Sequence, residues 1–174
     1  MGFSKVIYWW IKKKMDNLFF QDNSRIYYIN LSREAYEQML HYCNESNPYE
    51  TGGILIGNYS PNLETANILQ ITPPPKNSTH KKYSFHRSST ELKKILDFAW
   101  DQGYYYLGEW HYHPNSSATP SNVDIKQMID FSKNKNLKCP EPILVIIGGN
   151  KNGWEITVSV FSDGKYICLK CYND

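Results

Sequence analysis

The chain has 174 residues, of which 41% are hydrophobic and 21% are charged, and these values are typical of one folded domain. Its 19 basic and 17 acidic side chains leave a formal net charge of +2, which is too small to indicate a nucleic-acid partner or an acidic membrane surface. The four cysteines are too few and too scattered for a small secreted disulfide framework, so a reducing cytoplasm is the expected location.

The first 24 residues are expected to form an N-terminal extension, followed by one domain over residues 25–174. An apolar run at residues 6–11 is followed by three lysines and shows no cleavable signal-peptide pattern. A membrane-spanning helix needs about 20 apolar residues, so this run is too short to cross a bilayer. We expect it to be a packed N-terminal element or a segment that docks on a partner.

The first half of the domain is expected to contain both strands and helices. Apolar and polar residues alternate, or apolar residues cluster between turn residues, in the predicted strands at 25–31, 52–57, 65–72 and 82–86, with a polar, mobile loop at 76–80. Apolar residues recur at helical spacing in the two predicted helices, which run from the Ser32 cap to about Asn47 and from the Ser88 cap to about Gln102.

The second half is predicted to be one strand, one helix and three closing strands. These elements are expected at 104–110, 121–134, 142–148, 154–161 and 165–171. The turn sequence Ser162-Asp163-Gly164 predicts a hairpin between the last two strands. Together the elements predict an α/β sandwich with a mixed sheet flanked by helices.

Three potential metal ligands, His111, His113 and Asp124, lie at one strand-to-helix junction. The spacing of the histidines puts both imidazoles on the same side of an extended backbone. Two imidazoles and one carboxylate are the ligand set of a catalytic zinc, which keeps its fourth position open for water. Bound zinc lowers the pKa of that water to about 7, so the pattern predicts a metallohydrolase with one Zn²⁺ per chain.

Each of these residues also has a plain structural explanation. A His-x-His pair recurs by chance, and Ser121 with Asp124 matches a helix capping box. A carboxylate in the first helical turn can serve the cap and still face a cation. The conjunction of the motif with Pro114, which ends the strand, and Pro120, which precedes the helix, favours the metal site.

The general base is expected to be a glutamate, and two candidates are present. Glu50 stands at the start of a buried strand, where it could carry a proton from the attacking water to the leaving amine or could be a solvent-facing turn residue. Glu109 lies on the same strand face as both histidines. Spacing alone does not choose between them.

The chain resembles the JAB/MPN/JAMM zinc metalloproteases, and is most similar to their prokaryotic branch. The resemblance spans about residues 25–172 and is carried by Glu50 with its Gly-Gly strand, Gly108-Glu109-Trp110-His111-Tyr112-His113-Pro114 and Ser121-Asn122-Val123-Asp124. It implies a deaminase-like sandwich, the JAB/MPN fold, and a zinc isopeptidase or peptidase. Tyr112 departs from the commoner Ser or Thr and is expected to leave the ligands intact and reshape the rim of the pocket.

The resemblance also assigns roles and partners. It implies His111, His113 and Asp124 as zinc ligands, Glu50 as the general base and Ser121 as the residue that hydrogen-bonds the substrate carbonyl or its oxyanion. The implied substrate is a ubiquitin-like modifier, or another protein, with an extended C-terminal tail. Activating and conjugating enzymes of the same pathway, including those of bacterial antiphage systems, are the implied partners.

Three other functions remain open at this stage. A small-substrate or sulfur-carrier peptidase would use the same zinc chemistry, and a scaffold of the same fold could bind partners without catalysis. A nucleobase deaminase would need a His-x-Glu element and a Pro-Cys-x-x-Cys clamp. Glu109-x-His111 runs in the reverse order, and Cys168-x-x-Cys171 lacks the proline, so the deaminase is disfavoured.

Overall fold

The computed structural model describes residues 16–73 and 89–172. The apolar run at 6–11, the predicted loop at 76–80, the strand at 82–86 and the Ser88 cap lie outside the described residues. No helix in the described part of the chain is both long enough and apolar enough to span a membrane.

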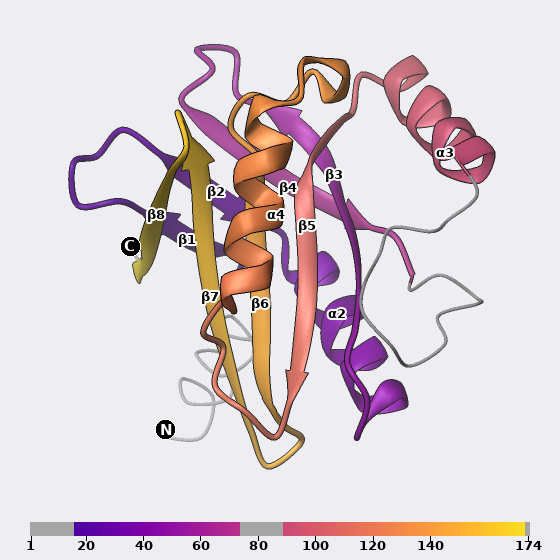
Figure 1. Cartoon of the computed structure of the whole chain (residues 1–174), viewed down its shortest axis with the longest axis vertical. Helices are drawn as coiled ribbons and strands as arrows, with labels where there is room; N and C mark the ends of the chain where they lie inside the picture. Colours follow the sequence, from indigo (N-terminus) through magenta and orange to yellow (C-terminus); the bar gives the residue numbers. More distant parts are fainter. Residues whose placement is uncertain (1–15, 74–88, 173–174) are drawn as a thin grey trace, which may run out of the picture.

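The strands form one curved, mixed sheet that closes on itself, in the order β1-β2-β4-β3-β5-β6-β7-β8 (Figure 1). The pairs β2–β4 and β5–β6 are parallel and the other pairs are antiparallel. The predicted mixed sheet with helices is confirmed, although its closure into a barrel was not predicted. The strands are β1 (Leu18–Gln21), β2 (Tyr28–Leu31), β3 (Thr51–Tyr59), β4 (Thr65–Ile71), β5 (Tyr105–Pro114), β6 (Ile143–Asn150), β7 (Gly153–Ser162) and β8 (Lys165–Tyr172).

The helices cover both faces of the sheet. Helix α2 (Arg33–Ser46) packs on the inner face and forms the main core with side chains from all the strands of the barrel. Helix α4 (Asn122–Lys133) covers the outer face over Leu144, Ile146 and Phe161, and α3 (Ser89–Asp101) packs against β3 through Ala99. Because β6 is covered on both faces, its sequence is a continuous apolar run rather than an alternating one.

A bulge in β5 decides which face its later side chains occupy. Leu55 pairs with Gly108 but Ile56 pairs with Tyr106, so Leu107 is an extra residue in β5. Gly108 has a φ of 145°, and a Cβ there would lie 1.9 Å from the Ile143 carbonyl oxygen, so only glycine fits. As a result Leu107 and Trp110 both face the main core. Bulges commonly re-aim side chains beside functional sites, and this one places Glu109, His111 and His113 on the face that α4 covers.

The domain begins earlier than the sequence predicted. Residues 1–24 were expected to precede the domain, but β1 pairs with β2 and with β8 and so closes the barrel. Phe20 of β1 is fully buried in the main core. The sheet therefore starts at Leu18, seven residues before the predicted boundary at 25 (25 − 18 = 7). The run Leu18-Phe19-Phe20-Gln21 is too short to identify as a strand without its partner near the C-terminal end.

The turn between β1 and β2 is organised by a buried carboxylate. The side chain of Asp22 accepts hydrogen bonds from the backbone N–H groups of Ser24, Ile26 and Tyr27 at 2.8, 2.7 and 2.8 Å. Burial raises the pKa of the Asp22 carboxyl, but these donors lower it more, and the net pKa lies below the usual value. The ionised carboxylate is therefore a stabilising group of the folded state.

We expect Asp22→Asn to lower the free energy of unfolding at pH 7 by about 1–3 kcal/mol, because hydrogen bonds to a charged acceptor are lost. The pKa of this group is lower in the folded than in the unfolded state, where it is about 3.9. Its contribution is therefore complete above that value and is lost as the pH falls through the folded-state pKa. The gap between the melting temperatures of the two proteins should stay constant from pH 7 to about pH 5 and narrow as the pH falls below about 3.9. The exposed Asp97→Asn is the control, and a gap independent of pH would contradict the prediction.

Candidate metal centre

Strand β5 presents two histidines on the face that α4 covers. His111 and His113 project to the outer side of the sheet. The alternate residues, Trp110 and Tyr112, project into the main core. The sequence predicted that this strand carries the histidines, and β5 does so, although it extends to Pro114 rather than ending at residue 110. The His111 side chain is 7% exposed and that of His113 is 16% exposed. Both rings are therefore held in place on a rigid strand.

The first turn of α4 brings a carboxylate to both rings. Asp124 Oδ1 lies 2.9 Å from His111 Nδ1, and Asp124 Oδ2 lies 3.6 Å from His113 Nε2. Asp124 is also the N3 residue of a complete capping box, in which its backbone N–H donates to Ser121 Oγ at 3.2 Å. The Ser121 backbone N–H and hydroxyl donate to Asp124 Oδ2 at 2.8 and 2.6 Å. The helix cap and the histidine cluster therefore share one carboxylate.

The loop between β5 and α4 is fixed against the end of β6. The Asn115 N–H donates to the Gly149 carbonyl at 2.9 Å, and the Gly149 N–H donates to the Ser116 carbonyl at 2.7 Å. A Cβ on Gly148 would lie 2.4 Å from the backbone nitrogen of Ala118, so the close approach of this loop requires glycine. These contacts hold the loop so that α4 lies back over β5. Asp124, in the first turn of α4, therefore reaches the two histidines.

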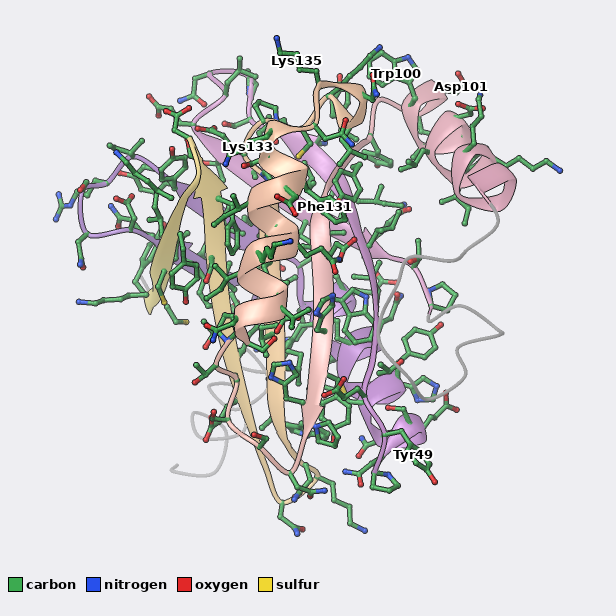
Figure 2. All side chains as sticks on the ribbon, in the orientation of Figure 1. Tyr49, Trp100, Asp101, Phe131, Lys133 and Lys135 are labelled. Carbon is green, nitrogen blue, oxygen red and sulfur yellow. The ribbon has the colours of Figure 1, made fainter. Side chains whose placement is uncertain are left out.

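Glu50 lies beside this cluster, immediately before the neighbouring strand β3. Gly52 pairs with His111 and Thr51 with Tyr112, so the antiparallel register continued by one residue places Glu50 opposite His113. Glu50 is exposed, and its negative charge contributes to the raised pKa of His113. Tyr49, next to it, lies at the end of the molecule opposite to Trp100 and Lys135 (Figure 2). The structure thus brings together the five residues to which the family resemblance assigned roles.

A second buried carboxylate stands behind His111. Glu109 Oε2 is 3.2 Å from His111 Nε2, and it also accepts a hydrogen bond of 2.9 Å from Gln127 Nε2 of α4. From the sequence, Glu109 was predicted only as a rival base, and Gln127 was not predicted to belong to the site. A helical signal was present, because Gln127 lies three residues after Asp124 and therefore on the same side of the helix.

The electrostatics of the cluster follow from these contacts. Burial lowers the pKa of His111, but the hydrogen-bonded carboxylates of Asp124 and Glu109 raise it to about 9. The Asp124 carboxylate likewise raises the pKa of His113, against the effect of burial. Burial raises the pKa of Asp124, but hydrogen bonds from His111, His113 and Ser121 hold it far below its usual range. The carboxylates therefore stabilise positive charge on the two imidazoles, as they would stabilise a bound cation.

The ligand types of His111, His113 and Asp124 fit zinc. In this structure, however, the side chains contact one another directly, at hydrogen-bonding or ion-pair distances. Within residues 16–73 and 89–172, no group of three or more His, Cys, Asp or Glu side chains is already arranged as a metal site. Two ligands of a tetrahedral zinc lie about 3.3 Å apart, given metal–ligand distances of about 2.0–2.1 Å. The separation of 2.9 Å between His111 and Asp124 is shorter, and that of 3.6 Å between His113 and Asp124 is longer. Each of these two separations is within a few tenths of an ångström of the zinc-ligand spacing.

The C-terminal cysteine pair is not arranged as a metal clamp. Cys168 and Cys171 both lie in β8, three residues apart, so their side chains point to opposite faces of the strand. Cys168 pairs with Ser159 of β7, whereas Cys171 pairs with Phe20 of β1. Both cysteines are free in the structure, as are the buried Cys43 and Cys139. These positions favour the interpretation of the pair as ordinary strand residues.

The fold is that of the JAB/MPN domains. A solution structure of a protein from Desulfitobacterium hafniense superimposes with a TM-score of 0.60 at 18% identity, over 83% of this chain and 90% of that one. The chain also matches the family described as prokaryotic homologs of the JAB domain over residues 32–159. It therefore belongs to that family.

Two relatives carry the same name, CD-NTase/cGAS isopeptidase. The protein from Enterobacter hormaechei subsp. hoffmannii (strain UCI 50) is 37% identical over 146 residues, which cover 83% of this chain and 81% of the relative. The protein from Escherichia coli (strain TW11681) is 31% identical over 108 residues, which cover 60% of this chain and 65% of the relative.

Proposed function

We propose that the chain is a zinc-dependent isopeptidase that releases a ubiquitin-like modifier from a protein target. The JAB domain and the isopeptidase names of the relatives support hydrolase activity. The observation that carries the zinc dependence is the convergence of His111, His113 and Asp124, with Glu50 opposite His113. The relatives' name supports a CD-NTase as the target and a role beside the conjugating enzymes of an antiphage system.

In this proposal the three ligand residues hold the metal and Glu50 moves the proton. Bound zinc would supply Lewis-acid activation of water and of the scissile carbonyl. Glu50, exposed beside His113, takes one proton from the water that adds to the carbonyl carbon. As the carbon–nitrogen bond breaks, the same carboxylic acid returns that proton to the departing lysine amine. Its exposure lets it contact both water and substrate.

The substrate assay separates this function from its alternatives. The purified protein is incubated with an isopeptide-linked modifier–CD-NTase conjugate and with a modifier extended by a peptide at its tail. We expect cleavage of the conjugate, loss of activity on metal chelation and restoration by zinc, with no effect of thiol alkylation. Cleavage of only the extended tail would indicate a processing peptidase. Activity that survives chelation, or that is lost on alkylation with zinc retained, would contradict the proposal.

Ser121→Ala should have two separable effects. If the hydroxyl turns from Asp124 to the substrate oxyanion, its loss should lower turnover on the order of 10²-fold. Loss of the N-cap should also lower the free energy of unfolding by about 1 kcal/mol. Turnover at saturating zinc and the melting temperature measure the two effects. Ser121→Thr, which keeps a hydroxyl, should retain most of both, and full activity of Ser121→Ala would remove the serine from the mechanism.

A further inference from the structure

Apolar packing around β5 does not explain why a carboxylate, that of Glu109, is buried there. Its side chain is only 1% exposed, and burying an ionised group is costly unless it is paired. Its Oε2 contacts His111 Nε2 at 3.2 Å, on the ring nitrogen that does not face Asp124. In the described part of the chain Oε1 has no hydrogen-bond partner. The placement of this carboxylate is therefore explained by its contact with the histidine.

Helix α4 holds this carboxylate from the other side. Gln127 Nε2 donates to the same oxygen, Glu109 Oε2, at 2.9 Å. Gln127 and Asp124 lie three residues apart on α4, so one helix supplies a carboxylate to one nitrogen of His111 and fixes the carboxylate at the other nitrogen. The ring is thereby restrained at both nitrogens by groups that α4 orients.

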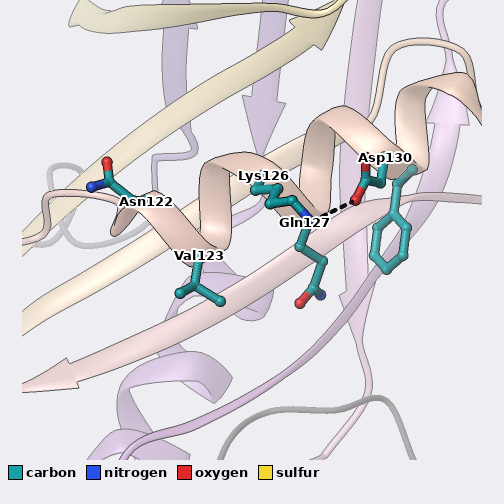
Figure 3. Close-up of a pocket in the computed structure, with 6 residues that line it drawn as sticks. Asn122, Val123, Lys126, Gln127 and Asp130 are labelled. Atoms are coloured by element: carbon teal, nitrogen blue, oxygen red, sulfur yellow. Dashed lines mark ion pairs between the residues drawn. The ribbon is translucent and has the colours of Figure 1, made fainter.

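Gln127 also borders a surface groove. The groove has a volume of about 450 Å³ and is lined by Asn122, Val123, Lys126, Gln127, Asp130 and Phe131. Val123 and Gln127 project from the same side of α4, and the Lys126–Asp130 ion pair, 3.7 Å long, lies beside them (Figure 3). Lys126 thus lines the same groove without joining the contact to Glu109, which makes it a matched control position.

We propose that Glu109 and Gln127 are positioning residues, which act through the ring of His111 to set the affinity of the site for its metal. The inference rests on the proposed function, because it takes His111 as a metal ligand. Carboxylates that accept a hydrogen bond from a ligating imidazole fix the orientation of its ring and increase its basicity. Removing such a partner weakens metal binding typically by 10–100-fold.

The experiment measures metal binding by the full chain, independently of catalysis. Metal-free protein is titrated with Zn²⁺ in competition with a chromophoric chelator, and with Co²⁺ to record its visible absorption bands. We expect Glu109→Gln to weaken zinc binding by roughly 10–100-fold and Gln127→Met to weaken it by roughly 10-fold, with altered cobalt bands in both. Lys126→Gln should keep the wild-type affinity and spectrum. The melting temperature of each metal-free variant checks that it is folded.

The double variant tests whether the two residues act through one contact. Because Gln127 reaches His111 only through Glu109, Glu109→Gln with Gln127→Met should weaken zinc binding by less than the product of the two single effects. Wild-type affinity and cobalt spectra in both folded single variants would overturn the inference while leaving the proposed function intact. If His111→Ala itself kept the wild-type zinc affinity, the proposed metal centre would be wrong and this inference with it.

Discussion

Glu50→Gln should lower turnover by roughly 10²–10⁴-fold while zinc content and melting temperature stay unchanged. Glutamine keeps the shape of the side chain but cannot accept the proton of the attacking water. Glu50 is exposed at the start of β3, opposite His113, so its replacement leaves the core intact. Steady-state turnover on the modifier–target conjugate, with metal analysis of the same sample, measures the expected result.

Glu109→Gln is the matched control for that experiment, because both changes convert a glutamate beside the same histidines. Glu109 is buried and paired with His111 and Gln127, so it is better placed to hold a ligand than to exchange protons with substrate. At saturating zinc it should cost much less turnover than Glu50→Gln. The reverse order, an inactive Glu109→Gln and a near-normal Glu50→Gln, would assign the base to β5 and refute the role proposed for Glu50.

Much of the candidate site could be predicted because it is local in the sequence. His111, His113 and Asp124 come from one strand, one loop and one helix turn, so their spacing and the capping pattern are visible without the fold. Glu50 is different, since only the antiparallel pairing of β3 with β5 brings it to His113. The role of Glu50 was predicted only from the family resemblance. Its position beside His113 follows from the pairing of β3 with β5.

The features that escaped prediction depend on contacts between distant segments. The bulge at Leu107 and Gly108 reverses the alternation of β5 and depends on the backbone of Ile143 in β6. Strand β1 is defined by its pairing with β8, near the other end of the chain. The hydrogen bond from Gln127 to Glu109 depends on how α4 lies over β5. A periodic pattern in one segment cannot reveal such contacts, because they are set by tertiary packing.

Asp124→Ala should remove both the metal and the activity, and it should also weaken the fold. The carboxylate contacts both imidazoles and Ser121, so its loss takes away one proposed ligand and the acceptor of the capping box. Loss of the cap alone costs about 1 kcal/mol of stability. Metal analysis after dialysis should therefore find little zinc, and the melting temperature of the metal-free protein should fall.

Asp124→Asn separates the two effects. The amide oxygen can still accept from the Ser121 N–H, so the helix cap and most of the stability should survive. Zinc should still be lost, because catalytic zinc sites are built from anionic carboxylate, thiolate and imidazole ligands and a neutral amide is not among them. Cys168→Ala with Cys171→Ala should leave one equivalent of zinc in place, since these side chains point to opposite faces of β8. One full equivalent of zinc retained by both Asp124 variants, or a second equivalent lost with the cysteines, would place the metal somewhere other than the β5–α4 junction.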